Sequence, residues 1–196
     1  RPLRPTPAAV GPFNGTGSEM IDGLPVTGVS SLNLDSNGRP WITFGSVGQG
    51  AARYDFAGDS WQPVRCPVSG PASPYVRHIV QTSDGLLWFA TEAGLAMFEG
   101  RSQTWNLLTT DDGLPGNVVQ ALAIHPDGSL WVGTSNGLAM WENGRFTPLN
   151  QDDVREMAIG PDGTIWFITA DAVFRWRDGQ AQNIVPPPVS QVYDVL

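Results

Sequence analysis

Few side chains in this sequence are of the kinds that carry out acid–base or nucleophilic chemistry. The chain holds two histidines, His78 and His125, and one cysteine, Cys66. A general base must lie within reach of the proton that it removes, and the two histidines are expected at opposite ends of different strands, where they make a poor catalytic pair. A single cysteine cannot form an internal disulfide or a thiolate metal cluster. We therefore expect structural or solvated histidines, no catalytic residue, no metal site and no cofactor.

Two pairs of acidic residues and the tryptophans are the other candidates for a binding or catalytic role. Asp111-Asp112 and Asp152-Asp153 are expected in loops, as solvated turn residues or side-chain caps of the backbone rather than metal ligands. An exposed indole can stack on a sugar, and a buried one fills a core. The roles of Trp61 and Trp105 are left open. Packing is favoured for the tryptophans that directly precede an apolar residue within a strand-like segment, namely Trp41, Trp88, Trp131 and Trp166.

These last four tryptophans belong to an internal repeat. They recur at intervals of 47, 43 and 35 residues, and a valine stands twelve positions before each of them. Such periods are typical of propeller blades, which are built from four short strands. Each tryptophan also follows a turn pair at the same offset: Asn37-Gly38, Asp84-Gly85, Asp127-Gly128 or Asp162-Gly163.

The clearest copy of the repeat, residues 111–149, contains strand-like segments at 118–124, 130–134, 138–141 and 145–149. Asp-Gly and Asn-Gly pairs between them supply the positive φ angles that tight hairpin turns require. The sequence therefore predicts an all-β fold, a β-propeller of four-stranded antiparallel blades at about 26–70, 71–115, 116–150 and 151–188. The first blade fits the repeat if residues 46–48 are treated as an insertion. Tyr54 then aligns with Phe98. No helix is expected.

Both ends of the chain resemble parts of a blade. Residues 190–196 match the start of a fifth inner strand, and residues 8–21 resemble outer strands. Propellers often close by building one blade from both termini, which removes exposed sheet edges. One solution is a five-bladed ring with a shared or incomplete blade. The other is an excerpt of a longer array, with open edges that further blades or self-association would cover.

One set of polar positions is the best candidate for a binding site. The two positions after the recurring valine hold mostly polar residues that differ between blades. Inner strands line the channel of a propeller, and their first residues lie at its mouth. The two arginines there could grip a carboxylate or sulfate; alternatively, the ring only solvates a channel and pairs arginine with acids. We predict a ligand site formed by Ser30, Arg77, His78, Gln120, Arg155, Glu156, Tyr193 and Asp194.

The charge balance limits the partners. With 19 acidic and 11 basic side chains the net charge is −8, which disfavours nucleic acid and anionic lipid. No apolar run is long enough to span a membrane. A protein partner, or a small polar, anionic or sugar ligand, is expected instead.

The pattern Gly-Leu-Pro at 113–115, Asp-Gly-x-apolar-Trp at 127–131 and Gly-Thr-x-x-Gly-Leu at 133–138 resembles the two-component regulator propeller repeat. The resemblance covers roughly residues 22–196. It implies a periplasmic or extracellular sensing module of a bacterial protein, a non-enzymatic propeller that recognises a ligand or a protein. The copies depart from the pattern at Asn37, Phe44, Ile168 and Ala172.

Two other functions stay open, since propellers host many unrelated activities. Residues 160–167 also resemble a propeller lyase that acts on streptogramin antibiotics. A lyase or hydrolase would work at the channel mouth with His78 as its base. A structural scaffold would instead bind protein partners through loops such as 67–74.

Overall fold

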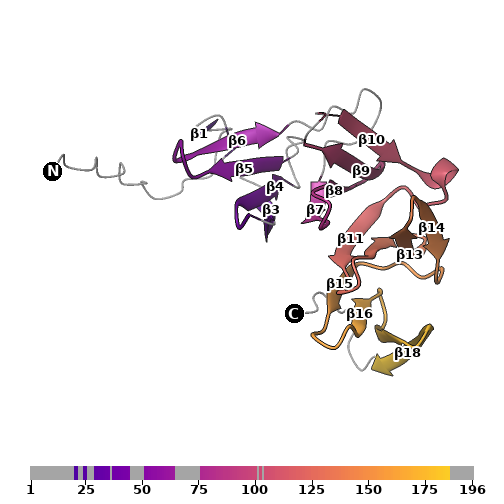
Figure 1. Cartoon of the computed structure of the whole chain (residues 1–196). Coiled ribbons are helices and arrows are strands. Elements are labelled where there is room, and N and C mark those ends of the chain that lie inside the picture. The colour runs from indigo at the N-terminus through magenta and orange to yellow at the C-terminus, as the bar shows by residue number, and fades with distance from the viewer. Residues whose placement is uncertain are drawn as a thin grey trace.

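The computed structural model describes residues 20–21, 24–25, 29–35, 37–44, 51–64, 76–100, 102 and 104–185. Four four-stranded antiparallel sheets follow one another along the chain (Figure 1), so the predicted all-β propeller fold is confirmed. A two-stranded hairpin, β1 (Met20–Ile21) and β2 (Leu24–Pro25), precedes them. The predicted fifth inner strand at 190–196 and residues 8–19 lie outside the described residues.

Each sheet is one blade, with its strands in sequence order from the inner to the outer edge. Blade 1 contains β3 (Val29–Leu34), β4 (Pro40–Phe44), β5 (Ala51–Asp55) and β6 (Ser60–Val64). Blade 2 contains β7 (Val76–Gln81), β8 (Leu87–Thr91), β9 (Gly94–Glu99) and β10 (Thr104–Leu108). Blade 3 contains β11 (Val119–Ile124), β12 (Leu130–Thr134), β13 (Gly137–Glu142) and β14 (Arg145–Pro148). Blade 4 contains β15 (Glu156–Ile159), β16 (Ile165–Ile168), β17 (Val173–Arg177) and β18 (Gln180–Val185).

The four blades lie side by side along an arc (Figure 1). Their first strands contact one another in succession, β3 with β7, β7 with β11 and β11 with β15. These inner strands run in the same sense, because each begins an identical up-and-down blade. The first residues of the inner strands therefore gather at one end of the arc's inner edge, and the turns that follow these strands gather at the other end.

The Asp-Gly turns between first and second strands are held by the aspartate side chain. In blade 3, Asp127 Oδ1 accepts hydrogen bonds from the Ser129 backbone N–H at 2.8 Å and from its hydroxyl at 2.6 Å, while Gly128 has a φ of +91°. Asp84 and Asp162 accept the equivalent backbone hydrogen bonds in blades 2 and 4. Blade 1 has Asn37 at this position, and Asp35 accepts the Arg39 N–H in its place. The turn geometry is thus kept by a different residue.

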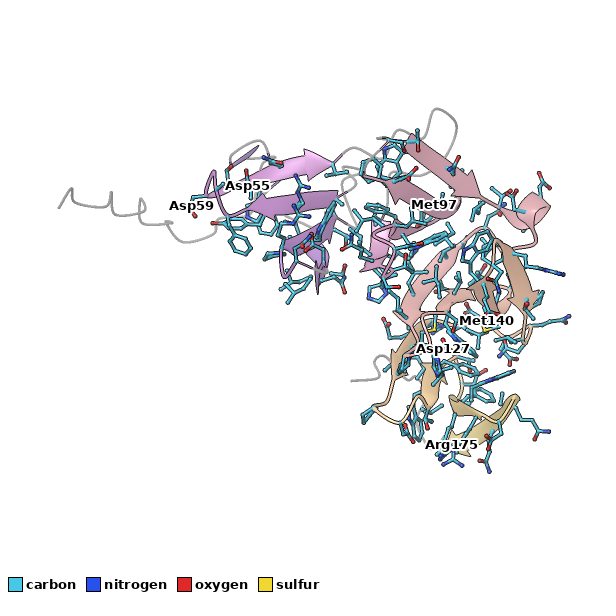
Figure 2. All side chains as sticks on the ribbon, in the orientation of Figure 1. Asp55, Asp59, Met97, Asp127, Met140 and Arg175 are labelled. Carbon is cyan, nitrogen blue, oxygen red and sulfur yellow. The ribbon has the colours of Figure 1, made fainter. Side chains whose placement is uncertain are left out.

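The recurring tryptophans pack between neighbouring blades, where side chains fill the space (Figure 2). Trp88 of blade 2 meets Trp141 of blade 3 edge-on, with ring centroids 5.7 Å apart, and Trp131 meets Trp176 in the same way at 5.8 Å. Burying an indole removes its N–H from water, so the donor needs a partner. The Trp88 Nε1 donates to Thr82 Oγ1 at 3.1 Å, and Trp131 Nε1 donates to Ser129 Oγ at 3.2 Å.

Packing is therefore confirmed for three of the four tryptophans predicted to be in the core: Trp41, Trp88 and Trp131 are buried, whereas Trp166 is half-buried. The two whose role was open also pack. Trp105 contacts Phe89 and Phe98 of its own blade, and Trp61 lies edge-on to Tyr54. The structure also agrees with the alignment of Tyr54 with Phe98. Trp41 pairs with Arg53, the residue before Tyr54, and Trp88 pairs with Met97, the residue before Phe98.

The described residues include no α-helix, but a short 3-10 helix, η1 (Thr110–Asp112), joins blades 2 and 3. The sequence predicted no helix. It did not indicate η1, because a helix of three residues is too short to show a periodic pattern. A capping box forms it: the Asp112 carboxylate accepts the Thr109 N–H at 2.9 Å, and the Thr109 side chain accepts from Asp111 N–H. Asp112 therefore acts as a backbone cap, one of the two roles expected for the acidic pairs.

One face of blade 1 is uncovered by the described residues. Val29, Leu32 and Leu34 are 57%, 66% and 66% exposed, whereas the residues at the first two of these positions in blades 2, 3 and 4 are at most 5% exposed. In those blades the preceding blade covers the same face, for example over Val119 and Leu122. Blade 1 thus presents an apolar surface that has the pattern of an inter-blade interface.

Candidate functional site

The polar position after the recurring valine is a β-bulge. In blade 2, Val76 pairs with Thr91 and His78 with Ala90, so Arg77 is an extra residue with no partner on β8. The same shift occurs at Ser30 in β3 and at Gln120 in β11. In blade 4, Arg155 N–H bonds to the Ile168 carbonyl, although Glu156 is the residue paired with Ile168. A bulge re-aims a side chain out of the sheet's alternation, and the fold repeats this device at the predicted mouth.

The bulged residues of blades 3 and 4 meet across the blade interface. Gln120 Nε2 donates to Asp153 Oδ1, and Arg155 Nε donates to Asp153 Oδ2 at 3.3 Å. One carboxylate, placed just before β15, therefore joins two of the predicted site residues. Arg77 forms an ion pair with Glu92, in the β8–β9 turn, at 2.9 Å. We call Arg77, Glu92, Gln120, Asp153 and Arg155 the mouth cluster.

The mouth cluster is accessible to solvent. Arg77 and Glu92 have side chains 46% and 36% exposed, and those of Arg155 and Asp153 are 44% and 39% exposed. Ion pairs at such exposure contribute about 0–1 kcal/mol. A ligand carboxylate could therefore replace Glu92 or Asp153 as the partner of an arginine at little cost.

His78 is placed differently from the other predicted site residues. Its side chain is half-buried, and its Nδ1 accepts the backbone N–H of Leu122 in blade 3 at 3.1 Å. Burial lowers the pKa of His78, and the Nδ1 that accepts the Leu122 N–H must be unprotonated. The imidazole is thus a neutral acceptor that joins the inner strands of two blades.

The remaining predicted residues divide into two groups. Glu156 is half-buried, and its carboxylate accepts the Met157 N–H at 3.1 Å. The Ser30 side chain, Tyr193 and Asp194 lie outside the described residues, as do Cys66 and the loop 67–74. The sequence interpretation did not include Glu92 and Asp153 in the site, because neither occupies the aligned strand position.

His125 has a structural role on the opposite face. Its Nε2 lies 3.0 Å from the Gly163 carbonyl of blade 4, and its Nδ1 lies 2.8 Å from Asp127 Oδ2. Burial raises the pKa of Asp127, and hydrogen bonds from Ser129 and His125 lower it. The hydrogen bonds have the larger combined effect, so the pKa of Asp127 lies below its usual value. Within the described residues no group of three His, Cys, Asp or Glu side chains could hold a metal ion.

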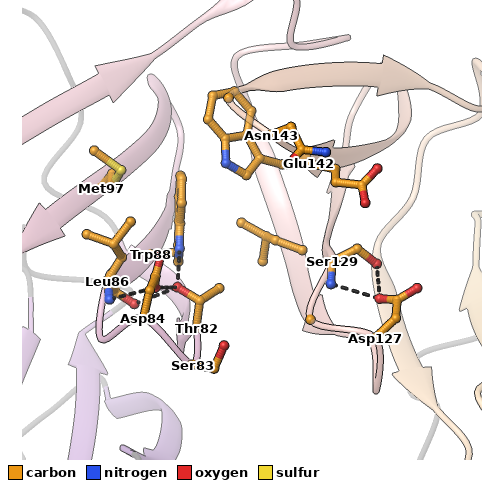
Figure 3. Close-up of a pocket in the computed structure, with 14 residues that line it drawn as sticks. Thr82, Ser83, Asp84, Leu86, Trp88, Met97, Asp127, Ser129, Glu142 and Asn143 are labelled. Atoms are coloured by element: carbon orange, nitrogen blue, oxygen red, sulfur yellow. Dashed lines mark hydrogen bonds between the residues drawn. The ribbon is translucent and has the colours of Figure 1, made fainter.

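Among the described residues, two grooves open on the face that carries the Asp-Gly turns. The first lies between blades 1 and 2, has a volume of about 350 Å³ and includes Trp41, Arg53 and Phe98 in its lining. The second lies between blades 2 and 3 and has a volume of about 560 Å³. Figure 3 shows the second groove, with Asp84 on one wall and Asp127 on the other. Both grooves are at the strand ends remote from the mouth cluster.

Two segments of the chain, 70–93 and 113–136, match the family model of the two component regulator propeller. These segments contain the first two strands of blades 2 and 3. The repeat that the sequence analysis recognised at 113–138 is therefore confirmed. Comparison with curated protein sequences finds no significant match.

The fold is similar to that of several solved bacterial propellers. The extracellular domain of a protein assigned to the hybrid two-component systems of B. thetaiotaomicron aligns with a TM-score of 0.70 at 18% identity, over 83% of this chain and 25% of that one. Virginiamycin B lyase from Staphylococcus aureus aligns with a TM-score of 0.66 at 18% identity, over 84% of this chain and 58% of that one. A gluconolactonase from Xanthomonas campestris aligns with a TM-score of 0.61 at 14% identity, over 83% and 63%.

These similarities show the fold. The chain spans about a quarter of the length of the sensor-domain structure and a little over half that of the lyase. None of the helices in the described part of the chain is long and apolar enough to cross a membrane.

Proposed function

We propose that this chain, whose repeats match the two component regulator propeller, is part of a non-enzymatic recognition module of an extracytoplasmic bacterial sensor, and that it contacts its ligand through the mouth cluster. The observation that carries the proposal is the bulge that recurs at Ser30, Arg77 and Gln120. Buried valines precede these residues in blades 2 and 3. The fold therefore keeps a polar, variable side chain at this point while it keeps the packing residues constant.

The chemistry of the mouth cluster favours a ligand with a carboxylate, a sulfate or several hydroxyl groups. Arg77 and Arg155 present guanidinium groups, which form two parallel hydrogen bonds with planar anions. Gln120 adds an amide that can donate and accept. A protein partner that offers an acidic side chain would use the same groups.

Binding is favoured over catalysis because of His78. An enzyme at this mouth would use His78 as its base, but the Nδ1 already accepts a backbone N–H and the ring is half-buried. The lyase and the gluconolactonase share the fold at identities of 18% and 14%, and fold alone does not carry activity. The name of the sensor-domain structure places that protein outside the cell, which supports an extracytoplasmic location for this chain.

The test is a binding screen by thermal shift and calorimetry with small dicarboxylates, sulfated sugars and neutral sugars. Arg77→Ala combined with Arg155→Ala should abolish binding of an anionic hit and leave the melting temperature within about 2 °C, because exposed ion pairs add little stability. Arg145→Ala combined with Arg177→Ala removes the same charge at exposed positions on the other face. Affinity that survives the first pair of substitutions, or falls equally with the second, would count against the mouth cluster.

A further inference from the structure

The larger groove on the face opposite the mouth has no role in the proposed function. It is lined from blade 2 by Thr82, Asp84, Trp88 and Met97, and from blade 3 by residues that include Trp141 and Glu142. We call it the acidic groove. Its volume of about 560 Å³ is within the range of sites that hold a small molecule or a long side chain.

The walls of the acidic groove carry negative charge with no basic residue among them. Asp84, Asp127 and Glu142 contribute three carboxylates. Asp127 is engaged by Ser129 and His125, and Asp84 uses only Oδ1, which accepts from Thr82 and Leu86. Within the described part of the chain, Glu142 and Asp84 Oδ2 take part in no hydrogen bond or ion pair. Two acceptor groups are therefore available to a bound cation.

The equivalent groove between blades 1 and 2 shows what such a site accommodates. There Arg53 takes the position of Met97, Trp41 that of Trp88, and Phe98 that of Trp141. The Arg53 guanidinium lies over the Trp41 ring, 5.9 Å from its centroid, and donates to Gln62 at 2.9 Å. The chain thus places its own guanidinium against the aromatic wall of one groove.

The acidic groove lacks this internal cation. Met97 replaces the arginine, the cavity is larger, and the half-buried indole of Trp141 replaces a phenyl ring. We propose that the acidic groove binds an arginine side chain from a partner protein against its aromatic wall. Arg53 lies over Trp41, whose counterpart Trp88 is 2% exposed, so the guanidinium of the partner would instead stack on the half-buried Trp141 and direct its N–H groups to Glu142 and Asp84.

This inference goes beyond the proposed function and uses no residue of the mouth cluster, so either can fail alone. The probe is blocked arginine, Nα-acetyl-arginine N-methylamide, titrated into the ¹⁵N-labelled chain while the indole N–H signals are followed. The Trp141 signal, assigned by its loss in Trp141→Phe, should shift saturably. Blocked citrulline, which is neutral and of the same shape, should leave it unchanged. Equal shifts with arginine and citrulline would overturn the proposal.

Two carboxylate variants test the contacts. Glu142→Gln and Asp84→Asn should each weaken binding by roughly threefold to fivefold, as expected for charge pairs at a partly exposed site. Asp178→Asn makes the same change of net charge in the β17–β18 turn of blade 4 and should leave affinity unchanged. Full affinity in the Glu142→Gln/Asp84→Asn double variant, or equal weakening by Asp178→Asn, would show that the groove does not hold the ligand.

A third variant fills the acidic groove from within. Met97→Arg should reproduce the arrangement of Arg53 over Trp41 and reduce the affinity for blocked arginine by more than tenfold. If Met97→Arg folds and binds as well as the unchanged chain, the proposal is wrong. If it does not fold, the two carboxylate variants decide, because both residues are exposed and lie in turns or at a strand end.

Discussion

The Nδ1 of His78 in blade 2 lies 3.1 Å from the backbone nitrogen of Leu122 in blade 3 and accepts its hydrogen. This hydrogen bond connects the inner strands β7 and β11 through a side chain. It requires an unprotonated Nδ1, because the imidazolium ion has a donor at both nitrogens. Burial, which lowers the pKa of His78, acts in the same sense.

The first prediction concerns pH. The pKa of His78 in the folded chain lies below the unfolded value of about 6.5, so the unfolded state binds more protons as the pH falls below that value. The free energy of unfolding should therefore decrease on acidification from about pH 6.5 toward 5, by at most about 1.4 kcal/mol for each pH unit. Urea titrations at pH 8, 7, 6 and 5 measure it. In His78→Asn this dependence should become shallower, and an unchanged slope would assign it to other groups.

The second prediction compares two glycines of blade 3 that both have positive φ. At Gly137, φ is +148° and an added Cβ would lie 2.5 Å from the Asn150 carbonyl oxygen; at Gly128, φ is +91° and nothing lies within 4 Å of that position. Gly128→Ala should cost about 1–2 kcal/mol from backbone strain alone. Gly137→Ala should cost distinctly more, because the chain after β14 must also move. Equal losses in chemical denaturation would show that the close approach relaxes freely.

Much of the fold could be predicted because each blade repeats the same local signals. The Asp-Gly turns fix where β11 ends and β12 begins, and the tryptophan four residues after the aspartate fixes which face packs. Even Tyr54 could be aligned, by allowing an insertion in the repeat. The 3-10 turn at Thr110–Asp112 was missed because three residues give no periodic pattern.

The candidate site could be predicted less completely. The alignment of the repeats showed that the positions of Arg77 and Gln120 are polar. It could not show the bulges at these residues, because a bulge depends on how β7 and β11 pair with β8 and β12. Their partners are Glu92, in the β8–β9 turn, and Asp153, in the loop before β15, and their contacts depend on distance in the folded chain rather than on position in the repeat. His78 was placed in the same ring, although its ring nitrogen is used within the fold.

The third prediction uses one position of the repeat in two blades. Leu122 of blade 3 is 1% exposed beneath blade 2, while Leu32 at the same position of blade 1 is 66% exposed. Leu122→Ala should destabilise the chain by about 2–5 kcal/mol through the cavity it leaves. Leu32→Ala should change stability by less than about 0.5 kcal/mol, as at other surface sites. A large loss at Leu32 would mean that another blade covers this face in solution, and a concentration-dependent loss would identify that blade as part of a second copy.

The fourth prediction concerns Asp35, which is 7% exposed and replaces the usual turn aspartate in blade 1. Burial alone would raise its pKa, but hydrogen bonds from the Arg39 and Asn37 backbone and from the Trp41 indole outweigh burial and lower it. Its ion pair with Arg39, at 2.7 Å, satisfies the second carboxylate oxygen.

Because the pKa of Asp35 is lower in the folded state, its contribution to stability should be complete above about pH 4 and should be lost as the pH falls through the folded value. Asp35→Asn keeps the shape but removes the charge, and hydrogen bonds to charged groups contribute about 1.5–3 kcal/mol. We expect a loss of that order at pH 7 and a smaller one at pH 3, measured by urea denaturation. Asp84→Asn, at an exposed turn of blade 2, is the matched control and should cost less at pH 7. If the two variants lose equal stability, the buried carboxylate is not what holds the blade 1 turn.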